Sequence, residues 1–312
     1  MAKQSINIGT SANDGTGSTL REAFDICNDN FTELYGGTTS ALGFKSEGTN
    51  FTGSLLIGHS TTGVISSAEN NTGVGIGALD ALTTGDSNVA IGNLAGSAIT
   101  SAGSNMLIGR AAGDALTSGS YNTAIGHFAL SAEDHHGGNV AVGHEALKVQ
   151  NAGADAYNIA IGYHAGQSVT TGIQNVIVGG LAADALTTGG GNVALGDRAL
   201  SAEDTGSYSV AVGYRALQQQ DNNDNNYNIA VGADAGRSIN SGIYNVVIGG
   251  LAGDALTSGT RNVAIGLNAL GSEDTGSHNV AIGHGALKTA DAGADAYNVA
   301  IGSSAGTAVT TG

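Results

Sequence analysis

The sequence predicts an all-β fold, a parallel β-solenoid or β-roll built from coils of 17 or 19 residues. A short segment, Asn-Val-Ala-Ile-Gly with Ala three residues later, recurs from Asn88 to the end of the chain. The glycines that close these segments are spaced 17, 17, 17 and 19 residues apart, three times in succession, which gives a superperiod of 70. Self-similarity at a fixed period indicates a repeat architecture. The closing glycines are Gly92, Gly109, Gly126, Gly143, Gly162, Gly179, Gly196, Gly213, Gly232, Gly249, Gly266, Gly283 and Gly302.

The residues just before each closing glycine predict a short strand. Positions one and three before it, such as Ile91 and Val89, are mostly branched aliphatic residues. Side chains alternate along a strand, so these two share a face, and we expect that face to be buried. The residue between them is usually Ala, with exceptions at Leu107, Ile177 and Val247. We interpret this small-residue face as a surface for close approach of another copy of the chain.

Three further columns of the repeat have a predicted role. Asn stands four residues before the closing glycine in twelve of thirteen coils, with Ser209 as the exception, and predicts a hydrogen-bonded ladder of side chains. The glycine itself permits a sharp turn where a Cβ atom would clash. Ala stands three residues after the glycine in every coil, and we expect a second short strand there.

Each coil has little apolar bulk, and apolar stripes need covering. We therefore expect a parallel homo-oligomer, most simply a homotrimeric rod. At about 4.8 Å per coil, fourteen or so coils would extend roughly 65 Å.

The chain divides into three predicted segments. Residues 1–36 form a helical attachment and trimerisation segment, residues 37–72 a linker with a degenerate first coil, and residues 73–312 the solenoid. Thr19 and Glu22 fit a capping box at the start of the helix. Apolar residues then follow at spacings of 4, 3, 4 and 3, which is the pattern of a coiled-coil seam. Alternatively, the helix packs on its own first coil. The seam residues are Leu20, Phe24, Cys27, Phe31 and Leu34.

Composition excludes several classes of partner. The net charge is −16 with only 10 Lys and Arg residues, so there is no basic face for nucleic acid or for anionic membranes. No apolar run is long enough for insertion into a membrane, and the start of the chain has no apolar signal core. These features disfavour export of the chain alone by a classical pathway and leave release by cell lysis, as in a virus particle, as an alternative. The chain stops part-way through a coil at Gly312, which we interpret as a longer natural protein or an end covered by a partner.

The acidic residues do not predict an active site, and we expect no enzymatic activity and no resident cofactor. Three Glu-Asp pairs, beginning at Glu133, Glu203 and Glu273, are interpreted as solvated loop carboxylates. Calcium is an alternative for the aspartates of the long coils, because hard cations bind oxygen clusters. Histidines such as His127 and His144 share a variable column with other residue types, so a metal site is not expected there. The aspartates in question are Asp155, Asp221, Asp224, Asp291 and Asp295.

Six of the nine tyrosines share one column, five residues before the closing glycine, and are our candidates for contact with glycans. Amphipathic rings along an edge can stack on sugar faces. The alternative is that they shield strand ends and the seam between chains. These residues are Tyr121, Tyr157, Tyr208, Tyr227, Tyr244 and Tyr297.

The repeated NVAIGxxA segment resembles the head repeats of trimeric autotransporter adhesins, over roughly residues 73–312. The resemblance implies a left-handed parallel β-roll with three chains to a rod, and binding to host surfaces. The coils here are longer than is usual in that family, and its signal peptide and membrane anchor have no counterpart.

The opening segment, from INIGT at Ile6 through DGTG at Asp14 to NDNFTELY at Asn28, resembles structural proteins of contractile-tailed bacteriophages, especially marine cyanophages. That resemblance implies a virion protein, often a fibre, located in the tail and extracellular after release. Its N-terminus would bind other virion proteins, and its rod would attach to host glycan or protein. The alternatives are a non-binding spacer or decoration protein, a bacterial surface adhesin, and a glycan-depolymerising tailspike.

Overall fold

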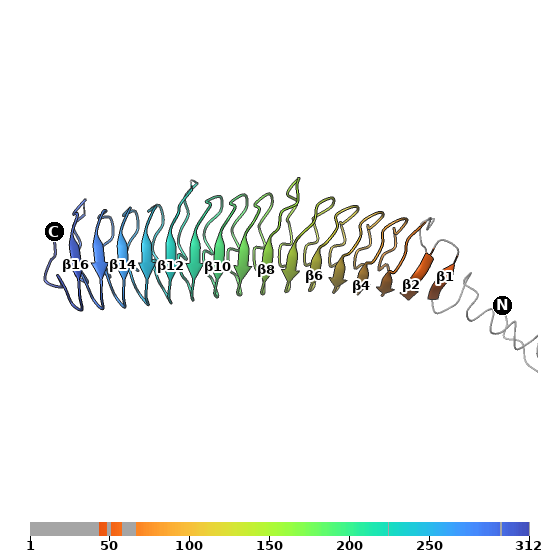
Figure 1. Cartoon of the computed structure of the whole chain (residues 1–312), viewed down its shortest axis with the longest axis horizontal. Helices are drawn as coiled ribbons and strands as arrows, with labels where there is room; N and C mark the ends of the chain where they lie inside the picture. Colours follow the sequence, from red (N-terminus) through yellow and green to blue (C-terminus); the bar gives the residue numbers. More distant parts are fainter. Residues whose placement is uncertain (1–43, 49–50, 58–66, 224, 294, 312) are drawn as a thin grey trace, which may run out of the picture.

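The computed structural model describes residues 44–48, 51–57, 67–223, 225–293 and 295–311, and it is a parallel β-solenoid. Sixteen strands form one sheet in sequence order, and the coils stack into a single elongated rod (Figure 1). β1 is antiparallel to β2, and each later strand pairs in parallel with the next. The predicted fold class is therefore confirmed. The strands are β1 Phe44–Gly48, β2 Phe51–Ile57, β3 Thr72–Val74, β4 Val89–Ile91, β5 Met106–Ile108, β6 Thr123–Ile125, β7 Val140–Val142, β8 Ile159–Ile161, β9 Val176–Val178, β10 Val193–Leu195, β11 Val210–Val212, β12 Ile229–Val231, β13 Val246–Ile248, β14 Val263–Ile265, β15 Val280–Ile282 and β16 Val299–Ile301.

The described residues contain no helix. The predicted N-terminal helix, the 1–36 segment and the seam from Leu20 to Leu34 lie outside them. The structure contains one chain, so the predicted trimer and its handedness stay predictions.

The closing glycine ends each strand in a conformation that only glycine adopts easily. Gly126 has φ of +143°, and a Cβ atom built on it would lie 2.1 Å from the carbonyl oxygen of Gly143 in the next coil. The neighbouring coils stack so closely here that no side chain fits. The predicted role of this glycine is confirmed.

The second short strand predicted after the glycine is wrong, because turns occupy this part of each coil. Glu145 and Leu147, two and four residues after Gly143, both have positive φ, at 57° and 49°. Left-handed residues in alternation prevent an extended backbone. The turns still stack on the next coil, since the Leu147 amide donates to the carbonyl of Ala165 at 3.1 Å.

The asparagine ladder is confirmed. Asn192 is buried, and its backbone amide donates to Oδ1 of Asn175 at 2.9 Å. Its own Oδ1 accepts from the amide of Ser209, and its Nδ2 donates to the carbonyl of Gly206, both at 2.9 Å. Each ladder side chain thus satisfies buried backbone groups in its own coil and the next.

The expected assignment of the two strand faces is wrong. The central residue of each strand points into the rod, and Ala160 is fully buried. Its neighbours in β8, Ile159 and Ile161, are 37% and 40% exposed. The interior of so thin a coil has room for a small side chain, so the branched residues of a three-residue strand remain on the outer face. We call the residues one and three before each closing glycine the outer strand face.

Larger central residues are accommodated by glycine across the interior. Leu107 is fully buried. A Cβ atom on Gly96 would lie 2.7 Å from its Cδ1 atom, and one on Gly113 would lie 2.8 Å from its Cδ2 atom. In coils distant from such a large central residue, such as that of Ala141, the position of these glycines holds a buried leucine, Leu147. Large and small side chains thus exchange places while the interior stays filled.

Candidate functional site

The six tyrosines predicted as a glycan-contact column lie along one edge of the rod, which we call the tyrosine edge. Each lies two residues before the first residue of a strand, and each has positive φ, from 51° to 63°. They are exposed, from 45% for Tyr227 and Tyr244 to 75% for Tyr121. The structure thus displays all six, and their contact with glycans stays a prediction.

Three of these tyrosines form a stack. The ring of Tyr227 lies 5.3 Å from that of Tyr208 and 5.7 Å from that of Tyr244, with interplanar angles of 9° and 6°. The Arg261 guanidinium lies 5.4 Å from the centre of the Tyr244 ring. Neighbouring rings therefore cover both faces of Tyr227, and its edge and hydroxyl remain open.

The other three differ in how much of the ring remains free. Tyr297 stacks on His278, with ring centres 4.8 Å apart. Among the described aromatic rings, none stacks on Tyr121 or Tyr157. A sugar can therefore stack on a ring face at Tyr121 or Tyr157, whereas the stack around Tyr227 presents hydroxyls for hydrogen bonds.

The glutamates of the acidic pairs are not the solvated loop carboxylates that the sequence suggested, whereas Asp134 and Asp204 are partly exposed and Asp274 is exposed. Glu133, Glu203 and Glu273 are each fully buried. They occupy the interior position that holds leucine in other coils, seven residues after the closing glycine, as at Leu116 and Leu186. The burial of these glutamates could have been predicted from the sequence, because they share one column of the repeat with leucines.

Glu203 is satisfied within the rod. Its Oε1 accepts from the amide of Gly206 at 2.6 Å, and its Oε2 accepts from Gln220 at 2.9 Å and Asn226 at 2.8 Å. Burial raises the pKa of this carboxyl, although the hydrogen bonds from Gln220 and Gly206 act in the opposite direction. A carboxyl enclosed in this way does not reach a substrate outside the rod.

The carboxylates considered for calcium lie in different surroundings. Glu203, Asp204 and Asp221 each offer an oxygen within 4.8 Å of the others, as do the corresponding residues of the next superperiod, Glu273, Asp274 and Asp291. By contrast, Asp155 accepts from the amide of Gly137, and Asp295 lies 3.7 Å from His278. Asp224 lies outside the described residues. Calcium stays an alternative for these aspartates.

The outer strand face is the other extended feature, since it continues along the rod from β2 to β16. Its apolar residues are partly buried in strands such as β7 and β9, and the most exposed of them reach 36% to 70%, including those of the last coil. Isolated exposed apolar residues are ordinary, but a continuous stripe of them marks a contact surface. The most exposed members are Leu55, Ile91, Met106, Ile159, Ile161, Ile229, Val231, Ile248, Val299 and Ile301.

Comparison with known proteins gives no match of any kind: no family model, curated protein or solved structure is similar to this chain. In the part of the chain that the structure describes, no helix has the length and apolar character needed to span a membrane.

Proposed function

We propose that this chain is a fibre protein of a phage particle, assembled as a homo-oligomer, most simply a trimer, and used for attachment to the host. The observation that carries the proposal is the outer strand face. A rod with an apolar stripe along its whole length needs a partner of the same length, and a parallel second or third copy supplies one.

The tyrosine edge supports a role in attachment. Parallel chains would display it in several copies, and repeated weak contacts gain strength through avidity. The ligand class that fits phenol edges and hydroxyls is a host surface glycan. The N-terminal segment would then join the rod to other virion proteins.

The mass of the purified protein in solution, measured by light scattering after size exclusion, tests the assembly. The double variant Ile159→Asp/Ile161→Asp places charges on the outer strand face and should convert the oligomer to single chains with an unchanged circular dichroism spectrum. The control, Thr171→Asp, adds the same type of charge at an exposed turn and should leave the mass unchanged. A wild-type mass of one chain would contradict the proposal.

Binding to host cells tests the attachment role separately. A rod that is oligomeric but binds no host cells would favour the spacer or decoration protein. A secretion route or anchor encoded nearby would favour the surface adhesin.

The depolymerising tailspike predicts sugar released from host glycan and loss of that activity in Glu203→Ala/Asp204→Ala. The burial of Glu203 weighs against this alternative.

A further inference from the structure

A cluster of two histidines and a glutamate lies on the turns that follow β7 and β8. His144 and Glu145 follow the closing glycine Gly143, and His164 lies two residues after Gly162. The coils stack in register here, because the His164 amide donates to the carbonyl of His144 at 2.9 Å. Glu145 and His164 have nearly the same backbone conformation, with φ of 57° and 56°.

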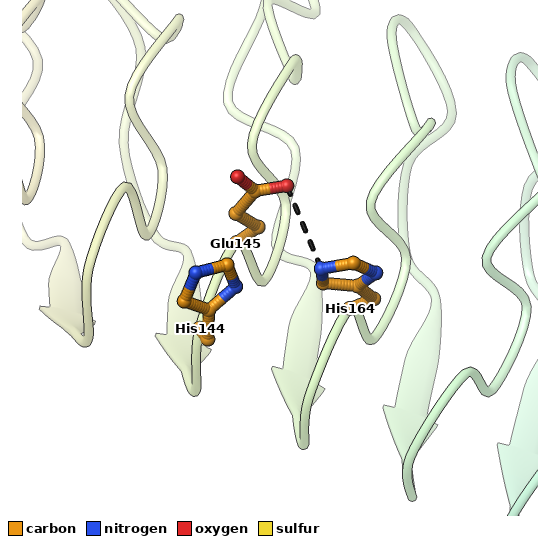
Figure 2. Close-up of side chains that lie close together, drawn as sticks. All are labelled: His144, Glu145 and His164. Carbon is orange, nitrogen blue, oxygen red and sulfur yellow. Dashed lines mark ion pairs between the residues drawn. The ribbon is translucent and has the colours of Figure 1, made fainter.

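The three side chains converge (Figure 2). One ligand atom from each lies within 4.8 Å of the other two. The Oε2 atom of Glu145 and the Nε2 atom of His164 are 3.6 Å apart, and the two imidazole rings have centres 5.4 Å apart. Tyr163 stacks on both rings, at 3.8 Å from His164 and 5.4 Å from His144, and so holds their orientation.

The Nδ1 atom of His144, which faces the other two side chains of this cluster, has no hydrogen-bond partner. Nε2 of His144 lies 3.2 Å from Nδ1 of His127 in the preceding coil, and the ring turns its other nitrogen toward Glu145 and His164 (Figure 2). That atom, Nδ1, is buried and makes no hydrogen bond. A buried polar atom without a partner is costly, and a bound ion is one explanation for it.

Glu145 is held ready as an anionic ligand. Lys148 lies 3.0 Å from its Oε1, an ion pair that favours the charged carboxylate. Gln167 donates to Oε2. The carboxylate is thus fixed on the side where the two imidazoles lie.

The rest of the chain shows that the fold does not require this combination. One superperiod later, the same three positions hold Tyr214, Arg215 and Asp234, and Arg215 pairs with Asp234 at 2.8 Å between Nε and Oδ1. Two superperiods later, they hold His284, Gly285 and Ser304. The same turn geometry therefore accommodates an ordinary ion pair or no pair at all.

We propose that His144 Nδ1, His164 Nε2 and Glu145 Oε2 bind a divalent transition-metal ion, with Zn²⁺ as the best match. Two imidazoles and one carboxylate are a ligand set that Zn²⁺ accepts, with its fourth position left to water. The ion would join two consecutive coils. This inference stands independently of the proposed fibre function.

The second nitrogen of His144 adds a specific expectation. Arg110 donates to Nε2 of His127 at 2.9 Å, which places the proton of neutral His127 on Nδ1, facing His144. A metal on His144 Nδ1 requires the opposite arrangement, in which His144 Nε2–H donates to His127 and His127 Nε2–H faces outward. Arg110 therefore opposes metal binding, and Arg110→Gln, which offers an acceptor there, should tighten it.

Titration calorimetry of the untagged full chain with zinc chloride tests the site. We expect one Zn²⁺ per chain, and none in the triple variant His144→Tyr/Glu145→Arg/His164→Asp. That variant copies residues 214, 215 and 234, so the coil already accommodates its side chains. His284→Ala, the matched control in the third superperiod, should bind as the wild type does.

The reverse exchange, Tyr214→His/Arg215→Glu/Asp234→His, should raise the stoichiometry to two. Single variants His144→Ala and His164→Ala should each weaken binding tenfold or more, on the order of the losses known for metal-site residues. Absence of Zn²⁺ binding by the wild type would overturn the proposal, and so would binding that survives the triple variant.

Loss of binding in His136→Ala alone would also overturn it, because His136 belongs to a separate cluster with Glu133 and Asp134. Unchanged or weaker binding in Arg110→Gln would contradict the assignment of Nδ1 of His144 as the ligand atom.

Discussion

Removing one rung of the asparagine ladder should destabilise the rod locally by an amount that follows from its hydrogen bonds. Asn192→Ala leaves the amide of Ser209 and the carbonyl of Gly206 without partners. Both residues are buried. An unsatisfied buried group costs about 1–3 kcal/mol, so the two together should cost about 2–6 kcal/mol. Asn93→Ala is the control, because this exposed asparagine makes one hydrogen bond, to the carbonyl of Ile76, and should change stability by no more than about 0.5 kcal/mol.

A solenoid does not unfold as one two-state unit, so the free energy must be measured where the change is made. Hydrogen exchange with mass spectrometry reports the opening of the coils around residue 192. A loss of 2 kcal/mol corresponds to roughly thirtyfold faster exchange of the protected amides there, with distant coils unaffected. Exchange in Asn192→Ala within about threefold of the wild type would refute the reasoning and would mean that water or a neighbouring side chain satisfies both groups.

Three more predictions follow from the interior of the rod. Gly126→Ala should cost at least about 3 kcal/mol, because it combines a strained φ with a backbone clash against Gly143. Gly153→Ala, with positive φ but nothing within 4 Å of its Cβ, should cost about 1–2 kcal/mol; equal acceleration of hydrogen exchange in the coils around the two sites would contradict the packing argument. Leu107→Ala should cost about 2–5 kcal/mol in the same assay, since glycines surround that side chain and a cavity would remain. For Glu203, the folded-state pKa is raised, so its contribution to stability is fully present below the unfolded pKa of about 4.3 and is lost as the pH rises through the folded value. The melting temperature should therefore rise as the pH is lowered from 7 toward 5, and Glu203→Gln should make the melting temperature depend less on pH. If the variant shows the same pH dependence as the wild type, the effect belongs to other carboxyls. Asp114 and Asp184 are examples, because burial also raises their pKa values.

Sequence reasoning located the strands, the ladder and the closing glycines because each has a fixed spacing and a residue type with a single structural use. It failed to tell the inside of the coil from the outside. Alternation in a three-residue strand separates two faces, but it does not say which of them is enclosed. The enclosed face could have been identified from the large residue Leu107 and the small residues Gly96 and Gly113 around it. Only residues that share an interior need to compensate for one another in volume.

The candidate sites were also predicted from the sequence only in part. The tyrosine edge was visible as a column, whereas the stacking that covers the faces of Tyr227 depends on ring orientations that the sequence does not specify. The cluster of His144, Glu145 and His164 was missed because its members belong to two different columns of the repeat. Its recognition required knowing that the two extra residues of the 19-residue coil leave the following turn in register with the preceding one.

The superperiod of 70 residues makes the length of this protein adjustable by recombination. Positions 70 residues apart have equivalent neighbours above and below, so a chain in which Asn122 is followed directly by Val193 retains the ladder and the alternation of leucine and glutamate inside the rod. Such a deletion removes four coils, or about 19 Å, and leaves one junction at which the coils still stack in register. Unequal exchange between gene copies can therefore produce longer and shorter rods in whole units, each with an interior that is already packed.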